Sequence, residues 1–229
     1  MHAAVFVLAA ELVSLAGGER LVVEHPAAGT PVRGAVLLIP GGSTTLNLGA
    51  NGETGSPNFV IRTRALLRDA GFVTAYMDDP ENLRDAIARL RAVATPVIVV
   101  STSRGTLVAT DNTARLGNAG PDLLVLTSPI TTGSKKNPTA IGISTALQIS
   151  VPTLVVANQH DACAVSTPGG AEALAAAFSP PATFVSVDST QTRGDPCGPT
   201  SPHGFLGIES DVINQIVSWV ASTQARATR

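Results

Sequence analysis

The sequence predicts an α/β fold, in which a mostly parallel, twisted β-sheet carries helices on both of its faces. Two observations predict it. Short apolar runs rich in Val, Ile and Leu alternate with longer amphipathic stretches, and this alternation is typical of parallel sheets with crossover helices. Ala, Val, Gly and Leu are abundant, which suits a buried sheet and closely packed helices. One such sheet can accommodate 229 residues, so we expect a single domain over residues 1–229.

The N-terminal part precedes the main alternation. Residues 1–10 are largely apolar with no Lys or Arg before the apolar run, and they fit either a remnant of a secretory signal or an irregular N-terminus. Residues 11–15 and 20–24 flank a turn that contains two glycines, so we expect a β-hairpin. The first long apolar run, residues 32–39, predicts the first strand of the parallel part.

Hydrophobic periodicity predicts the remaining elements. Residues 57–70 carry apolar side chains at helical spacing. Asp79-Pro80-Glu81 is typical of a helix start, because Asp can cap and Pro suits the first turn. We expect further strands at residues 72–77, 96–100, 123–127, 153–157 and 183–187, and further helices at residues 79–94, 106–116, 139–149, 170–178 and 206–223.

Composition argues against several classes of partner. The formal net charge is -2, charged residues make up 14% of the chain, and no block of like charge occurs. We therefore expect no nucleic-acid partner and no anionic membrane partner. Aromatic residues, at 3%, are too few for the stacking platforms that bind single-stranded nucleic acid. No apolar run is long enough to span a bilayer.

The most informative motif is Ser-Thr-Ser-Arg-Gly at residues 101–105, between an apolar strand and a predicted helix. This is the context of a nucleophile elbow, where a serine occupies a strained turn. The residues two before and two after that serine must be small, and Ser101 and Gly105 meet the condition, although Gly is usual at the first position. An ordinary strand-to-helix turn contains the same residue types.

Two more chemical groups follow later strands. Asp161 comes after the next-to-last strand, and His203 ends the loop after the last strand. Because open α/β sheets place their sites at the carboxyl ends of strands, we expect Ser103, Asp161 and His203 to meet as catalytic residues. A serine needs an imidazole base, and a buried carboxylate holds that imidazole in the correct tautomer. Asp188 and Asp195 are rival acids, but both lie beyond the strand that normally delivers the acid.

Acyl transfer also requires donors for the oxyanion of its tetrahedral intermediate. The backbone N–H of Arg104, directly after the elbow serine, is the first candidate. The segment Pro40-Gly41-Gly42-Ser43 follows the first long strand and offers the second, with Gly42 as the expected donor and Ser43 as the alternative. A simple tight turn would use the same glycines.

With these motifs, the chain resembles a small α/β-hydrolase of the esterase and dienelactone-hydrolase-like kind. The resemblance extends from about residue 33 to residue 219 and includes the chain order serine, acid, histidine. More narrowly, the chain is similar to bacterial hydrolases that combine Thr-Ser-Arg-Gly-Thr (102–106), Asp-x-Cys (161–163), Asp-Pro-Cys (195–197) and His-Gly-Phe-Leu-Gly-Ile-Glu (203–209). The resemblance implies an α/β-hydrolase fold and hydrolase chemistry, and it names no substrate.

The two cysteines lie beside the expected acid and base. Cys163 is two residues after Asp161 and Cys197 six before His203, so a disulfide would join the loops that deliver these groups. Two free, buried cysteines in a cytoplasmic protein are the alternative. A zinc site that adds His160 and His203 to the cysteines lacks the usual paired ligand spacing, so we expect no metal. A disulfide favours a periplasmic or secreted location.

These observations predict a serine hydrolase, most specifically a carboxylesterase that forms an acyl-enzyme on Ser103 and uses no cofactor. The segment between the strands at 123–127 and 153–157 is too short for a large lid, and the expected rim, residues 43–58 and 130–137, is rich in Thr, Asn, Gly and Ser. We therefore expect a small or moderately polar ester as the substrate. A thioesterase, lactonase, polyester depolymerase or peptidase would use the same residues, and a non-catalytic binding protein is the alternative from another class.

Overall fold

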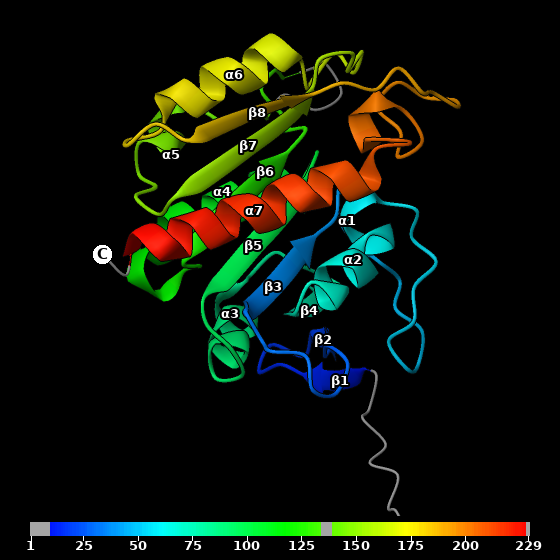
Figure 1. The fold of residues 1–229 in the computed structure, drawn as a ribbon, viewed down its shortest axis with the longest axis vertical. Coiled ribbons are helices and arrows are strands. Elements are labelled where there is room, and N and C mark those ends of the chain that lie inside the picture. Colours follow the sequence, from blue (N-terminus) through cyan, green and yellow to red (C-terminus); the bar gives the residue numbers. More distant parts are fainter. Residues whose placement is uncertain (1–9, 134–138, 228–229) are drawn as a thin grey trace, which may run out of the picture.

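The computed structural model describes residues 10–133 and 139–227, so the expectation for residues 1–9 lies outside the described residues. Its central element is a sheet (Figure 1). The strands are β1 (Glu11–Ser14), β2 (Arg20–Glu24), β3 (Gly34–Ile39), β4 (Phe72–Met77), β5 (Val97–Thr102), β6 (Leu123–Thr127), β7 (Thr153–Asn158) and β8 (Thr183–Val187). Their order in the sheet is β1-β2-β4-β3-β5-β6-β7-β8.

The sheet is mostly parallel, as the alternation of strands and helices predicts. Strand β2 pairs antiparallel with β1 and β4, and all neighbours from β4 to β8 pair in parallel. The register sets Ile39 of β3 opposite Ser101 of β5, and Thr102 of β5 opposite Thr127 of β6. The carboxyl ends of these strands therefore lie side by side, and the loops that follow them meet at one edge of the sheet.

Helices cover both faces of the sheet (Figure 1). They are α1 (Phe59–Arg62), α2 (Arg64–Asp69), α3 (Arg84–Arg91), α4 (Gly105–Leu116), α5 (Ile143–Ala146), α6 (Pro168–Ala177) and α7 (Glu209–Ala227), with 3-10 turns η1 (Gly117–Ala119) and η2 (Pro202–Gly204). Helices α1, α2 and α7 contribute to the core on one face, and α3 to α6 contribute to the core on the other. Among the helices of residues 10–133 and 139–227, none is both long enough and apolar enough to span a bilayer.

Alternating residues of the central strands fill the two cores. In β3, Leu37 and Ile39 belong to the core under α3 to α6, whereas Val36 and Leu38 belong to the core under α1, α2 and α7. All six residues of β3 are buried. Burial on both faces explains why these strands read as continuous apolar runs rather than as alternating polar and apolar residues.

Two predicted helix boundaries are wrong. The helix expected at residues 57–70 is divided at Thr63, whose hydroxyl and N–H both bond to the carbonyl of Phe59. The helix expected from residue 79 begins at Arg84 instead. The residue before the helix is Leu83 rather than Asp79, and the N–H of Arg84 donates to the side chain of Asn82 at 3.2 Å.

Two other predicted helices are shorter. The helix expected at residues 139–149 is limited to the four residues of α5, so the described part of this segment forms no large cap over the sheet. The last helix begins at Glu209 rather than at residue 206. Phe205 has a φ of 59° and Gly207 a φ of 83°, and this left-handed backbone is incompatible with a helix through residues 205–207.

Candidate active site

Ser103 occupies the turn between β5 and α4. Its φ is 51°, in the left-handed region that costs energy for a residue with a side chain. The turn is held by backbone bonds from Ser103 N–H to the carbonyl of Thr127, at 3.0 Å, and from Thr106 N–H to the carbonyl of Ser103, at 2.9 Å. The Thr106 hydroxyl donates to that same Ser103 carbonyl at 2.6 Å. This strained, fixed turn points a hydroxyl out of the edge of the sheet.

The small residues on either side of Ser103 have distinct physical reasons. A Cβ at Gly105 would collide with the backbone carbonyl oxygens of Ile39 and Pro40, so the first turn of α4 passes too close to β3 for any side chain. Ser101 is fully buried, and its hydroxyl donates to the carbonyl of Val125 at 3.2 Å. The sheet therefore accommodates serine where the usual motif has glycine, without an unsatisfied hydroxyl.

His203 and Asp161 extend from Ser103 in a line. The Nε2 atom of His203 lies 2.8 Å from Oγ of Ser103, and Nδ1 lies 2.8 Å from Oδ2 of Asp161. The other carboxylate oxygen of Asp161 accepts the N–H of Cys163 at 2.9 Å. A carboxylate only accepts, so Nδ1 carries the proton and Nε2 is left to accept the serine proton. Both side chains are almost completely buried.

The loop that carries His203 is fixed from several directions. The hydroxyl of Ser128, directly after β6, donates to the carbonyl of His203 at 2.8 Å, and the hydroxyl of Ser201 accepts the N–H of His203 at 3.2 Å. Two residues further on, the ring of Phe205 packs against that of Phe59 in α1, with 4.9 Å between centroids. These contacts determine the position of the imidazole with little freedom.

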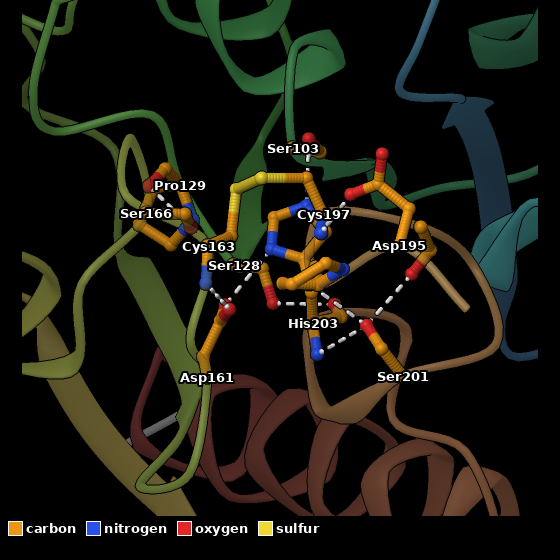
Figure 2. The surroundings of a disulfide bond; sticks show 12 residues. Ser103, Ser128, Pro129, Asp161, Cys163, Ser166, Asp195, Cys197, Ser201 and His203 are labelled. Carbon is orange, nitrogen blue, oxygen red and sulfur yellow. Dashed lines mark hydrogen bonds and ion pairs between the residues drawn. A yellow bond between two sulfur atoms is a disulfide. The ribbon is translucent and has the colours of Figure 1, made fainter. Parts of the chain in front are cut away.

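Cys163 and Cys197 form a disulfide, as the sequence predicts, and the alternative of two free cysteines is wrong. Figure 2 shows the bond beside the His203 ring, where it joins the loop after β7 to the loop before η2. Ligand atoms of Asp161, Cys163 and His203 lie within 4.8 Å of one another. However, both sulfur atoms are bonded to each other, so neither is available as the thiolate that a zinc site would use.

The rival acids lie elsewhere. Asp188 pairs with His160 at 3.1 Å on the surface. Asp195 accepts the N–H of Cys197 at 2.7 Å and so stabilises its own turn. Among the described residues, neither carboxylate contacts the imidazole of His203.

An open cavity of about 230 Å³ lies at Ser103 and His203. Its wall includes Gly41, Gly42 and Ser43, and a Cβ placed on Gly41 would lie only 2.8 Å from the Cβ of Ser103. The segment after β3 therefore passes directly beside the serine. In residues 10–133 and 139–227 we find no protein acceptor for the backbone N–H groups of Gly42, Ser43 or Arg104, the three groups expected as oxyanion donors.

The rim of this cavity agrees only in part with the sequence prediction. Residues 43–58 contribute Ser43, Thr45, Leu46, Ser56, Pro57 and Asn58 to the lining. Residues 130–133 do not line the cavity, and residues 134–137 lie outside the described residues. Phe59, Pro199 and Gly204 line it without having been expected. Pro199 is two residues after Cys197, and the predicted disulfide already placed Cys197 near Asp161, so the sequence could have indicated that Pro199 lies at the site.

The loop from β3 to α1, which supplies most of this lining, is held by an ion pair. The guanidinium of Arg20 donates to the carbonyls of Leu48 and Gly49 and to the carboxylate of Asp78. Burial acts to raise the pKa of Asp78, but hydrogen bonds from Arg20 and from the N–H of Leu48 outweigh it and lower the pKa below its usual value. Asp78 therefore stays ionised and continues to anchor the loop near neutral pH.

No protein-family model and no curated protein matches the chain, but many solved structures do. An α/β serine hydrolase without a lid from Xanthomonas campestris is 15% identical, with 90% of this chain and 94% of the other covered and a TM-score of 0.59. An esterase from the fungus Rhizomucor miehei is 16% identical, with 95% of this chain and 84% of the other covered and a TM-score of 0.61. A sugar hydrolase from Lactococcus lactis is 12% identical, with 95% of this chain and 99% of the other covered and a TM-score of 0.64.

The chain has the α/β-hydrolase fold. The predicted fold class is thereby confirmed. At these identities the likeness establishes the fold alone, because one fold hosts many chemistries. Function must therefore be argued from the side chains at the edge of the sheet.

Proposed function

We propose that the protein is a serine hydrolase, specifically a carboxylesterase that cleaves small or moderately polar esters. The observation that carries the proposal is the pair of 2.8 Å contacts joining Ser103 to His203 and His203 to Asp161, at the wall of an open cavity. Structural neighbours described as esterases, from Rhizomucor miehei and Bacillus coagulans among others, support the assignment to ester hydrolysis.

In the proposed acylation, Oγ of Ser103 attacks the ester carbonyl carbon while Nε2 of His203 accepts the hydroxyl proton. The carboxylate of Asp161 stabilises the imidazolium through Nδ1–H. The tetrahedral intermediate then expels the alcohol oxygen, which takes the proton from Nε2. An acyl-enzyme on Ser103 and a free alcohol result.

In the proposed deacylation, a water molecule attacks the acyl carbon, His203 accepts one water proton, and the bond to Oγ breaks as the proton returns to Ser103. Both tetrahedral oxyanions need donors. We assign these to the N–H of Arg104 and the N–H of Gly42, with Ser43 as the alternative to Gly42. The absence of a protein acceptor for these groups among the described residues supports the assignment.

The cavity supports a small substrate. Its volume of about 230 Å³ lies below the roughly 300–1,000 Å³ typical of pockets for drug-sized ligands. Its lining combines the hydroxyl groups of Ser43, Thr45 and Ser56 with the apolar side chains of Leu46 and Phe59. A short acyl group with a moderately polar alcohol is complementary to this mixture.

Intact-mass analysis after treatment with a fluorophosphonate tests the proposal, with wild type and Ser103→Ala compared side by side. We expect one adduct on wild type, none on the variant, and hydrolysis of p-nitrophenyl acetate and butyrate that disappears with the same substitution. Parallel assays with thioesters, lactones, polyesters and peptides establish whether esters are the preferred class. A folded wild type that neither labels nor turns over these substrates would favour the non-catalytic binding protein.

We also propose that the protein works in an oxidising compartment, periplasmic or extracellular, because disulfides persist there and are rare in the cytoplasm. Alkylation of thiols in protein isolated without reductant tests this. No alkylated cysteine is expected. Two alkylated cysteines in freshly isolated protein would indicate a cytoplasmic location.

A further inference from the structure

We propose that the side-chain amide of Asn58 donates a hydrogen bond to the substrate carbonyl oxygen and to the oxyanion that forms from it. The inference rests on the esterase function proposed above and adds a side-chain donor to the backbone groups of Gly42 and Arg104. Asn58 directly precedes α1 and lines the same cavity as Ser103 and His203.

The first observation is the position of the amide nitrogen. A Cβ placed on Gly41 would lie 2.8 Å from the Cβ of Ser103 and 3.4 Å from Nδ2 of Asn58. The nucleophile and the amide nitrogen thus flank the same backbone residue. That residue adjoins Gly42, so Nδ2 lies beside the segment to which the oxyanion is assigned.

The second observation is the orientation of the amide. The Oδ1 atom of Asn58 accepts the N–H of Val60 at 3.3 Å and thereby caps α1. A backbone N–H can only donate, so the oxygen of the amide must face Val60 and the nitrogen must face the opposite way, toward Gly41. In the described part of the chain Nδ2 has no hydrogen-bond acceptor, and Asn58 is only partly buried. A donor is therefore presented to the cavity.

The third observation is rigidity. Phe59, Val60 and Ile61, the residues that follow Asn58, are each at most 1% exposed. Phe59 also packs against Phe205, two residues after His203. The amide and the imidazole are therefore held in one packed unit, and a donor fixed in advance stabilises developing charge without reorganising.

The competing explanation is that Asn58 serves only as a helix cap, and two variants separate the roles. Asn58→Asp and Asn58→Ser both keep an oxygen that can cap α1, but both remove the amide donor. Asn58→Ser adds no charge, so it excludes repulsion by a new carboxylate as the cause of any loss. Asn82→Ser is the matched control, because the side-chain oxygen of Asn82 accepts the N–H two residues further on, that of Arg84, as Asn58 does for Val60, but at an exposed position away from the cavity.

We expect both Asn58 variants to lose roughly 100-fold in kcat/KM on p-nitrophenyl acetate, mostly in kcat. Their affinity for a trifluoromethyl ketone, which forms a tetrahedral adduct with the serine, should fall in parallel, while their thermal unfolding stays close to wild type. Asn82→Ser should keep wild-type kinetics. If Asn58→Ser retains kcat/KM within about twofold, less than any oxyanion donor is worth, the proposal is wrong and Asn58 is only a cap.

The two levels of inference fail in different ways. Wild-type enzyme that labels with fluorophosphonate and turns over ester, together with unchanged Asn58 variants, overturns only the role of Asn58. Wild-type protein that neither labels nor turns over ester overturns the esterase function and the Asn58 role together.

Discussion

The disulfide between Cys163 and Cys197 allows the effect of one covalent bond on stability to be worked out. The two residues are 34 apart in the sequence. In the chain-entropy model, closing a loop of that length lowers the entropy of the unfolded chain by about 13 cal/mol/K, which is about 4 kcal/mol at room temperature. Since small proteins are stable by only roughly 5–15 kcal/mol, reduction should remove a large part of the free energy of unfolding.

Three forms should be compared by equilibrium denaturant unfolding: oxidised wild type, wild type in excess dithiol, and the double variant Cys163→Ala/Cys197→Ala. The double variant also leaves a small cavity, because Cys163 is only 1% exposed. Reduced wild type has no such cavity. Agreement between reduced wild type and the double variant therefore assigns the loss to the cross-link.

The same bond has a second expected effect, on activity. It connects the loop of Asp161 to the loop of His203, so the reduced protein should show a lower kcat even at denaturant concentrations where it is fully folded. The reasoning is refuted if reduction lowers the free energy of unfolding by less than about 1 kcal/mol. A large stability loss with unchanged kcat would refute only the positioning argument.

Two other features make direct predictions. Gly105→Ala should destabilise the protein by roughly 1–3 kcal/mol or more and reduce activity, because the new methyl group collides with the carbonyl oxygen of Pro40. Gly169→Ala is the control, because a methyl group at this position of α6 meets no other atom. This control should be neutral or stabilise the protein by up to about 1 kcal/mol. Burial, reinforced by the carboxylate of Glu24, raises the pKa of Tyr76 to about 12 from 10.0. Because the folded state favours the neutral phenol, its stabilising contribution is complete below pH 10 and is lost as pH rises through about 12. Tyr76 is the one tyrosine in the chain, so tyrosinate absorbance that rises near pH 10 in the folded protein would contradict this.

The sheet was predictable where both faces of a strand are buried. Strands β5 and β6 contain continuous apolar runs because helices cover both of their faces. The limits of β6 match the predicted ones, whereas β5 continues through Ser101 and Thr102, beyond the end of its apolar run. Helix limits were less predictable, because they depend on hydrogen bonds between side chains and backbone. The helix expected from Asp79 begins only at Arg84, whose N–H donates to the side chain of Asn82, and the helix expected at residues 57–70 is divided where the hydroxyl of Thr63 donates to the carbonyl of Phe59.

The candidate site shows the same division. Parallel pairing places the ends of β5 and β7 at one edge of the sheet, so the chain positions of Ser103 and Asp161 were sufficient to expect them near each other. The position of His203 depends on a long loop, and the sequence indicated it by its place after the last strand. The disulfide at Cys197 ties that loop to the loop of Asp161. In both cases the order of strands along the chain determines at which edge of the sheet the side chain lies, and that order can be predicted from the sequence.

The proposed role of Asn58 could not be predicted from the order of residues in the sequence. Asn before Phe-Val-Ile-Arg is recognisable as a helix cap, and that reading explains only the amide oxygen. The direction of the nitrogen follows from the capping bond to Val60, and its destination follows from the close passage of Gly41 beside Ser103. Neither is encoded by a motif, because each depends on two loops that meet only after the sheet has formed. A capping residue whose second polar atom faces a cavity is therefore a place to look for further functional side chains in this fold.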